Sequence, residues 1–222
     1  MDEAVEFEFV GMYSMNNMKY FFKKLLITVV AIIIMALGVA AMRFSACGID
    51  PFGCMAGGID IYTGIGFGTA MLLQNGIILL GVFIFDKSKI GIGTILNMTI
   101  TGYGSDFFMY FIQKILTPDN LPLRIAALVS GIVIICFTAA IYIEANLGIA
   151  PYDAVALIIS QKTKKERWFR WIRIATDGIC SIIGLAFGNM PGIGTIAMSL
   201  FAGPLIAFFR KKNAALFIER KL

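Results

Sequence analysis

Two short glycine-rich motifs each occur twice in this chain, about a hundred residues apart. Gly-Ile-Asp-Pro-Phe at 48–52 returns as Gly-Ile-Ala-Pro-Tyr at 148–152, and Gly-Ile-Gly-Thr-Ile at 91–95 returns at 192–196. The offset stays at 100 to 101 residues, which indicates duplication of one structural unit. A duplicated unit with Gly/Pro breaks inside apolar segments is typical of small-solute membrane transporters.

The composition places the chain in a membrane. Hydrophobic residues make up 59% of the 222 residues and charged residues 15%, and the mean hydropathy is +0.83. A helix needs about 20 apolar residues to cross about 30 Å of hydrocarbon. Six stretches meet that length: 25–43, 66–85, 91–115, 122–143, 172–188 and 192–209. The sequence therefore predicts an all-α polytopic membrane protein without a separate soluble domain.

The six predicted helices divide into two repeats of three. We place an acidic N-terminal tail at 1–18, membrane repeat 1 at 19–119, membrane repeat 2 at 120–212 and a basic C-terminal tail at 213–222. The acidic start is unlike a cleavable signal peptide. It is explained either by a disordered tail or by a translation start at Met12, Met15 or Met18.

The distribution of charge predicts the orientation. All but Arg43, Lys114 and Arg124 of the 19 Lys and Arg residues fall on one predicted side, which by the positive-inside rule is the cytoplasmic side with both termini. Three spans in each repeat give the second repeat the opposite orientation, so the repeats have inverted topology. The net charge of +5 follows from this bias and does not predict a nucleic-acid partner.

Two apolar segments are too short to span, and we interpret them as half-helices. They run from Gly48 to about Gly64 and from Gly148 to about Ser160, either re-entrant from opposite faces or lying against the bundle. Broken backbone at membrane depth occurs where protein or a cavity satisfies it, so these breaks are the leading candidates for a site. An ordinary interfacial turn is the alternative. The candidate substrate- or ion-binding residues here are Asp50, Pro51, Phe52, Pro151, Tyr152 and Asp153, with Asp50 as an N-cap and each proline as a first helical residue.

Polar residues near the middle of the predicted helices form a second group of candidates. Gln74 and Asn75 correspond in the repeat to Thr176 and Asp177. Intramembrane ionisable groups are costly, and Asp177 is therefore the best candidate for carrying a coupling proton or holding a cationic solute. The alternative is a structural hydrogen bond or ion pair, with Arg173 one turn away.

The repeated Gly-x-Gly-Thr motifs each open a third helix. Their glycines allow another backbone to approach closely, and packing against a half-helix explains them without a ligand. Thr94, Thr195 and the nearby Asn97 are candidates for polar lining. No strand precedes these motifs and no Gly-Lys-Ser/Thr follows, so they do not predict nucleotide binding.

The chain has no histidine, and its four cysteines form no Cys-x-x-Cys motif. This pattern predicts no metal site, no cofactor and no catalytic residues, so we do not expect an enzyme. A disulfide between Cys47 and Cys54 is conceivable, but we favour two structural thiols.

These motifs resemble a known family of bacterial membrane proteins, the YczE/YyaS/YitT family. The segment 148–153 is similar to that family's Gly-x-Gly-Pro-Trp/Tyr-Asp turn, and 190–195 to its Pro-Gly-Ile-Gly-Thr element. The resemblance covers about residues 20–212 and implies a bacterial plasma-membrane protein of two related halves, with a role in solute export or in support of secondary metabolism. The first turn departs from the pattern, because Phe52-Gly53 replaces the aromatic–Asp pair and the acidic residue is Asp50.

The sequence favours a secondary carrier for a small solute or ion, working by alternating access. A channel-like pore and a non-transporting accessory or scaffold protein are the alternatives. We also expect contact with anionic lipid headgroups at Lys162, Lys164, Lys165, Arg167 and Arg170, beside both tryptophans, and we consider a homodimer possible.

Overall fold

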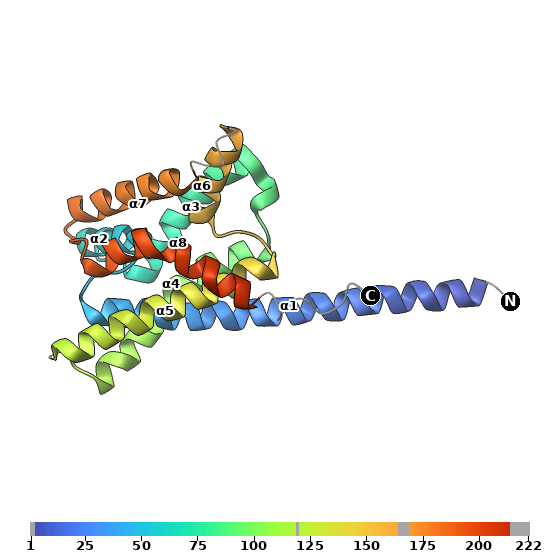
Figure 1. The fold of residues 1–222 in the computed structure, drawn as a ribbon, viewed down its shortest axis with the longest axis horizontal. Helices are drawn as coiled ribbons and strands as arrows, with labels where there is room; N and C mark the ends of the chain where they lie inside the picture. The colour runs from blue at the N-terminus through green and yellow to red at the C-terminus, as the bar shows by residue number, and fades with distance from the viewer. Residues whose placement is uncertain (1–2, 119, 164–168, 214–222) are drawn as a thin grey trace.

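The computed structural model describes residues 3–118, 120–163 and 169–213, with side chains from Met18 to Lys212 except at 119 and 164–170. The described chain folds into a bundle of helices (Figure 1). The helices are α1 (Glu3–Ser45), α2 (Pro51–Thr63), α3 (Phe67–Asp86), the 3-10 turn η1 (Lys87–Lys89), α4 (Ile92–Ile115), α5 (Leu121–Ala145), α6 (Pro151–Lys162), α7 (Phe169–Ala186) and α8 (Ile193–Asn213). All six predicted long helices and both predicted short ones are therefore present.

Four of the described helical segments are long and apolar enough to cross a membrane. They are Met18–Ser45, Phe67–Lys89, Leu121–Ala145 and Ile193–Lys212. The other two predicted spans form α4 and α7, but these helices are more polar. Asn97 and Asp106 lower the hydropathy of α4, and α7 contains Arg170, Arg173 and Asp177 within 18 residues. The prediction of an all-helical membrane fold is confirmed at this level.

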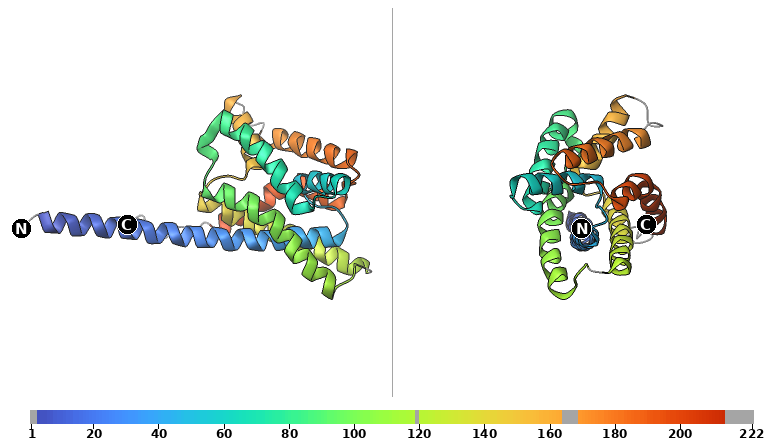
Figure 2. Two further views of the ribbon diagram at one scale, coloured as in Figure 1. Left: turned by 180° about the vertical axis from the view of Figure 1, so that it is seen from behind. Right: turned by 90° about the vertical axis from the view of Figure 1, so that its left-hand side faces the viewer.

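The two halves of the chain pack crosswise. α1 lies between α4 and α5, as the view along its axis shows (Figure 2), and α5 also packs on α8. Each short helix packs mainly on a long helix of the other half: α2 lies against α7, and α6 lies against α3. The halves are therefore interlocked, and neither forms a separate bundle.

Helix α1 extends well beyond the bundle at its N-terminal end (Figure 1). Because α1 begins at Glu3, the backbone of residues 3–17, predicted as part of a tail, continues the first helix. Residues 214–222 of the predicted C-terminal tail lie outside the described residues, as do Lys164, Lys165 and Arg167 of the predicted lipid contact. The side chain of Arg170 is not described either.

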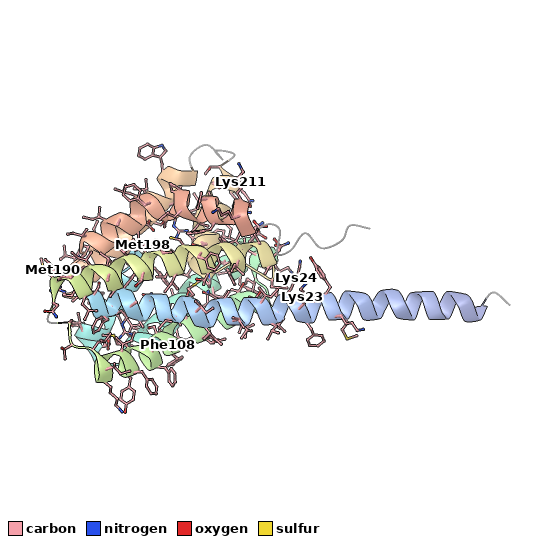
Figure 3. The ribbon with its side chains drawn as sticks, turned by 60° about the horizontal axis from the view of Figure 1, so that its bottom comes forward. Lys23, Lys24, Phe108, Met190, Met198 and Lys211 are labelled. Atoms are coloured by element: carbon pink, nitrogen blue, oxygen red, sulfur yellow. The ribbon has the colours of Figure 1, made fainter. Side chains whose placement is uncertain are left out.

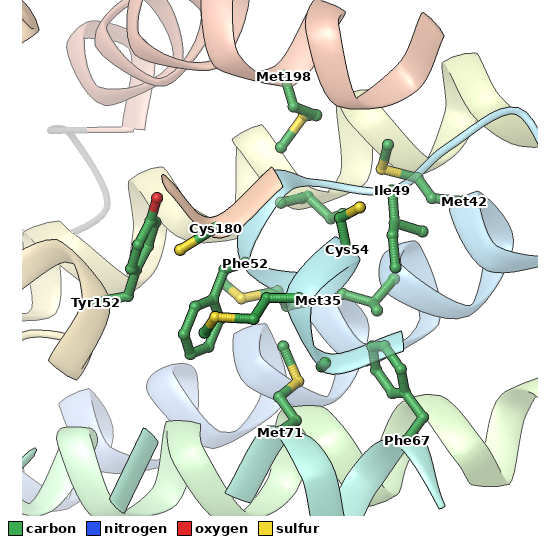
Figure 4. Packing of buried hydrophobic residues seen from close by; sticks show 14 of the residues in the cluster. Met35, Met42, Ile49, Phe52, Cys54, Phe67, Met71, Tyr152, Cys180 and Met198 are labelled. Carbon is green, nitrogen blue, oxygen red and sulfur yellow. The ribbon is translucent and has the colours of Figure 1, made fainter. Parts of the chain in front are cut away.

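A methionine-rich apolar cluster fills the centre of the bundle, where α2 and α6 approach each other (Figure 4). Its members come from both halves and include Met35, Met42, Ile49, Phe52, Cys54, Phe67, Met71, Tyr152, Cys180 and Met198. Large apolar side chains also cover the outside of the bundle (Figure 3), as expected for helices that face lipid. All four cysteines lie in the described residues and are free thiols, so there is no disulfide between Cys47 and Cys54.

Candidate functional site

Both half-helices begin at the predicted proline. Pro51 and Pro151 are the first residues of α2 and α6, where the missing N–H costs nothing. Asp50 is the N-cap of α2, and its Oδ2 accepts a hydrogen bond from the Gly53 N–H at 3.0 Å. Ala150 occupies the equivalent position before α6 and provides no side-chain cap. The first turn of α2 is thus capped by a carboxylate, and that of α6 has no such cap.

The repeated glycine motifs form two crossed junctions, defined here as the contacts of residues 47–49 with 192–195 and of residues 147–149 with 91–94. The Gly194 N–H donates to the Cys47 carbonyl at 2.9 Å, and the Gly93 N–H donates to the Leu147 carbonyl at 2.8 Å. A Cβ on Gly192 would lie 2.2 Å from the Cys47 carbonyl oxygen, and a Cβ on Gly91 would lie 2.2 Å from that of Leu147. Close packing of backbones therefore explains these glycines.

The two predicted threonines belong to the same junctions. Thr94 Oγ1 accepts from the Gly91 N–H at 3.1 Å and donates to the Ile149 carbonyl at 2.8 Å. Thr195 Oγ1 accepts from the Gly192 N–H at 3.3 Å. Both side chains are buried and use their hydroxyls to satisfy backbone groups within the protein.

The N-terminal ends of the two half-helices meet at the centre of the molecule. Phe52 and Tyr152, the second residues of α2 and α6, stack with ring centroids 4.7 Å apart and an interplanar angle of 23°. From this contact the helices run apart. Tyr62 near the end of α2 packs on Phe187 just beyond α7, and Lys162 at the end of α6 lies over Phe85 near the end of α3. The Phe52–Tyr152 contact and the polar groups around it are called the meeting point below.

A buried charged group borders the meeting point on the side of α7. Asp177 is only 4% exposed, and its Oδ1 accepts a hydrogen bond from the Tyr152 hydroxyl. The guanidinium of Arg173 forms a close ion pair with Asp153, and its Nε lies 3.4 Å from Asp177 Oδ1. The same guanidinium lies 4.9 Å from the centroid of the Tyr152 ring. Sequence reasoning considered Arg173 only as a partner of Asp177, and the stronger partner in the structure is Asp153.

Helix α3 contributes an amide on the other side. Gln74 is buried, and its Nε2 donates to the Phe52 carbonyl at 3.0 Å. Its Oε1 is also buried and has no hydrogen-bond partner. The neighbouring Asn75 donates to the Met71 carbonyl of its own helix. The Nδ2 of Asn97 lies 3.8 Å from the Met35 sulfur.

Asp50 is electrostatically linked to this charged group. Burial raises the pKa of the Asp50 carboxyl above its usual range, and repulsion by Asp177 acts in the same direction. The hydrogen bond from Gly53 and the attraction of Arg173 oppose both effects. The predicted residues Asp50, Phe52, Gln74, Tyr152, Asp153 and Asp177 thus gather around the meeting point, whereas Thr94 and Thr195 belong to the crossed junctions.

Two ion pairs that sequence reasoning did not predict join the first and last long helices within each half. Arg43 of α1 binds Asp106 of α4 at 2.7 Å, and the other carboxylate oxygen of Asp106 accepts from the Gly68 N–H at the start of α3. Glu144 of α5 binds Arg210 of α8, also at 2.7 Å. Arg43 and Glu144 occupy equivalent repeat positions with opposite charge, and each finds its partner within its own half. The signal for Asp106 was its charge inside an apolar helix.

Comparison with known proteins places the chain in a family. Residues 22–211 match a family of unknown function (DUF6198). The chain belongs to this family. Among its relatives, YczE of Bacillus subtilis (strain 168), described as an uncharacterized membrane protein, is 26% identical over 178 residues, 80% of each chain. YyaS of the same organism is 24% identical over 180 residues, 81% of this chain and 89% of its own.

A third relative comes from Haemophilus influenzae and is 26% identical over 189 residues, which is 85% of this chain and 84% of the relative. No solved structure matches the chain. The predicted resemblance to YczE and YyaS is confirmed, and the apolar helices and the description of YczE agree that the chain is a membrane protein.

Proposed function

We propose that this protein is a small-solute transporter, a secondary carrier that works by alternating access between two inverted repeats. The observation that carries the proposal is the meeting point, where the first turns of α2 and α6 face each other beside a buried charged group. In transporters, broken helices at membrane depth form the substrate site at the interface of the repeats. The proposal takes the meeting point to be such a site.

The pattern of contacts supports two repeats related by a pseudo-two-fold axis. The packing of α2 on α7 has its counterpart in the packing of α6 on α3, and α1 on α4 has its counterpart in α5 on α8. The two crossed junctions use the same backbone hydrogen bond. If three long helices in each half cross the membrane, the repeats have opposite orientation, and the charge bias puts both termini in the cytoplasm of a bacterial cell.

Because the halves are interlocked, the moving units in this mechanism would be the α2–α7 pair and the α3–α6 pair. They would shift against each other about the Phe52–Tyr152 contact and expose the meeting point first to one side and then to the other. Asp177, Tyr152 and Gln74 would contact the solute or coupling ion. Arg173 and Asp153, which are each about one-third exposed, would face the access route on the α6–α7 side. The chain carries no nucleotide-binding motif, so the proposed transport would be coupled to an ion gradient, driven by the solute gradient or powered by another subunit. No catalytic role is proposed.

The test is solute uptake by the purified full chain in proteoliposomes, using a mixture of labelled metabolites, with Asp177→Asn measured in parallel. A carrier gives saturable uptake and counterflow, both lost in the variant. Uptake that does not saturate would instead identify the channel-like pore. A cellular phenotype that survives Asp177→Asn but is lost when the basic residues of segment 161–170 are neutralised, with Arg173 left in place, would identify an accessory protein.

We place the proposed contact with anionic headgroups at the edge of the bundle, near the end of α6. Lys162 lies 4.6 Å from the Phe85 ring centroid, and Trp171 is 66% exposed. Amphipathic aromatic and cationic side chains favour the membrane interface. Binding to vesicles with and without anionic lipid tests this contact, and cross-linking in such vesicles tests the homodimer.

A further inference from the structure

The meeting point holds more carboxylate than cationic charge. Asp50, Asp153 and Asp177 surround it, and among the described residues Arg173 is the cation that contacts Asp153 and Asp177. From this imbalance and from the unpartnered oxygen of Gln74, we infer that the meeting point binds a small organic ammonium ion carrying at least one N–H. This inference rests on the proposed carrier function, because it names the substrate class of the same site.

The charge imbalance follows from how Arg173 is used. Its guanidinium is in close contact with Asp153, and its approach to Asp177 is looser, at 3.4 Å. Asp177 otherwise receives a neutral hydroxyl from Tyr152, and Asp50 receives a backbone N–H from Gly53. One guanidinium therefore serves three carboxylates, of which Asp177 is buried and Asp50 is half-buried, and uncompensated charge is costly in such a place. A bound cation would supply the missing positive charge.

The Gln74 side chain identifies the cation as a hydrogen-bond donor. The residue is 4% exposed, and its Nε2 is already bound to the Phe52 carbonyl in the first turn of α2. This bond holds the amide beside the Phe52–Tyr152 stack and leaves Oε1 buried without a donor. A buried acceptor without a partner is unfavourable, and an ammonium N–H would satisfy it.

The aromatic pair favours an organic cation. Aromatic faces attract ammonium and guanidinium groups, and the Arg173 guanidinium already lies 4.9 Å from the Tyr152 centroid. The site thus accommodates a cationic group, and an incoming ammonium would compete with Arg173 for Asp177. No group of three His, Cys, Asp or Glu side chains in the described part of the chain could hold a metal ion.

An anionic substrate fits less well, although the N-terminal ends of two helices converge here. Helix N-termini attract anions, and transporters use them in that way. In this protein, however, the first turn of α2 is capped by Asp50, and the first turn of α6 contains Asp153. The chain's own carboxylates occupy the positions that an anion would take.

Three ligands of similar size test the inference by calorimetry with the purified full chain in nanodiscs. Benzylammonium has N–H groups, benzyltrimethylammonium has the charge without them, and phenylacetate has the opposite charge. We expect benzylammonium to bind best, benzyltrimethylammonium to bind more weakly and phenylacetate not to bind. Asp177→Asn should weaken benzylammonium binding about tenfold or more, because it removes a charged hydrogen-bond partner.

Gln74→Met should abolish the preference for benzylammonium over benzyltrimethylammonium. The preference of the site for both cations over phenylacetate should remain. Glu144→Gln, which also neutralises a membrane carboxylate but lies at the Arg210 pair, should leave binding unchanged. If Asp177→Asn does not fold, weaker benzylammonium binding by Tyr152→Phe and Gln74→Met tests whether the ligand binds at the meeting point. Preference for phenylacetate, no binding of benzylammonium to the wild type, or binding that none of the meeting-point variants alters would overturn the inference.

Flux in proteoliposomes separates this inference from the proposed function. If benzylammonium binds as expected but no ammonium flux or counterflow occurs, the binding site stands and the carrier proposal fails. If metabolites are carried but benzylammonium neither binds nor competes with them, the carrier stands and the ammonium assignment fails.

Discussion

The crossed junctions and the meeting point were built from the same duplicated unit, yet they differ in how faithfully the two halves repeat each other. At the junctions, both halves use glycines at the contact and a threonine hydroxyl that accepts a backbone N–H. Around the meeting point, equivalent positions differ in charge: Asp50 and Ala150, Gly53 and Asp153, Asn75 and Asp177.

The difference has a geometric reason. The junction occurs twice in the molecule, so equivalent residues make the same backbone contacts at both places. The meeting point occurs once, and the two halves bring Phe52 and Tyr152 into direct contact there. Equal charges at equivalent positions around one shared site would repel, whereas unequal ones can combine. In this molecule, the glycines and threonines that pack the backbones are the same in both halves, and the residues around the proposed site differ between the halves.

The largest effect is expected where the backbones touch. Gly91→Ala and Gly192→Ala each place a methyl group 2.2 Å from a carbonyl oxygen, too close for either backbone to accommodate. Each substitution should cost about 3 kcal/mol or more of stability. Size-exclusion chromatography and thermal unfolding of the purified variants should show aggregated or strongly destabilised protein at both junctions.

Gly76→Ala and Gly178→Ala are the matched controls, because a Cβ at either helical position meets nothing within 4 Å. Both should leave the melting temperature unchanged or higher. Equal tolerance at all four positions would contradict the assignment of the junction glycines to close packing.

A smaller effect is expected at the meeting point. Tyr152→Phe keeps the ring stacked on Phe52 but removes the hydroxyl that donates to Asp177. Loss of this bond to a buried carboxylate should lower the free energy of unfolding by about 2 kcal/mol and impair solute binding. Tyr62→Phe, at a ring that is 74% exposed, should change neither the thermal unfolding nor the flux. If Tyr152→Phe changes neither stability nor solute binding, the Tyr152 hydroxyl has no role in the proposed site.

Substitution of the two threonines should lower the stability of the protein by modestly different amounts. Thr94→Val removes two hydrogen bonds, to the Gly91 N–H and the Ile149 carbonyl, whereas Thr195→Val removes the one to the Gly192 N–H. We expect losses of about 2 and about 1 kcal/mol in thermal or denaturant unfolding. A larger loss of stability for Thr195→Val than for Thr94→Val would contradict this assignment of hydrogen bonds to the two threonines.

The smallest effect is expected at the more exposed ion pair. The Arg210 side chain is 48% exposed, so Glu144→Gln should change stability by about 0.5 kcal/mol or less. Asp106→Asn should cost more, because Asp106 also accepts from the Gly68 N–H and Arg43 is only 19% exposed. Melting temperatures of the two variants give the comparison, and the reverse order would contradict it.

Local features of the fold could be predicted from the sequence because they depend on neighbouring residues. Apolar runs predicted the long helices, and Asp50-Pro51 and Pro151 predicted where the short ones begin. Six segments are long enough to span, but the polar residues of α4 and α7 leave four described helical segments that are both long and apolar enough.

The arrangement of the site could not be predicted in the same way, since its contacts join residues far apart in the chain. Gln74 and Phe52 meet across a turn, and Phe52 and Tyr152 are a hundred residues apart. The choice of Asp153 as the close partner of Arg173 depends on how α6 packs on α7, and no local pattern specifies it. Asp177 was identified correctly as a buried ionisable group because its charge stands out within its own helix.

The crossed junctions also bear on how the chain is made. The carbonyl of Cys47 accepts its hydrogen bond from the N–H of Gly194, which is synthesised much later. Part of the first half therefore cannot complete its hydrogen bonds until the last helix has left the ribosome. Unpaired backbone groups are unfavourable in lipid, and the unfinished first half should therefore depend on the insertion machinery or chaperones until then. A gene divided near codon 118 should yield two fragments that are degraded when produced singly and stable when produced together.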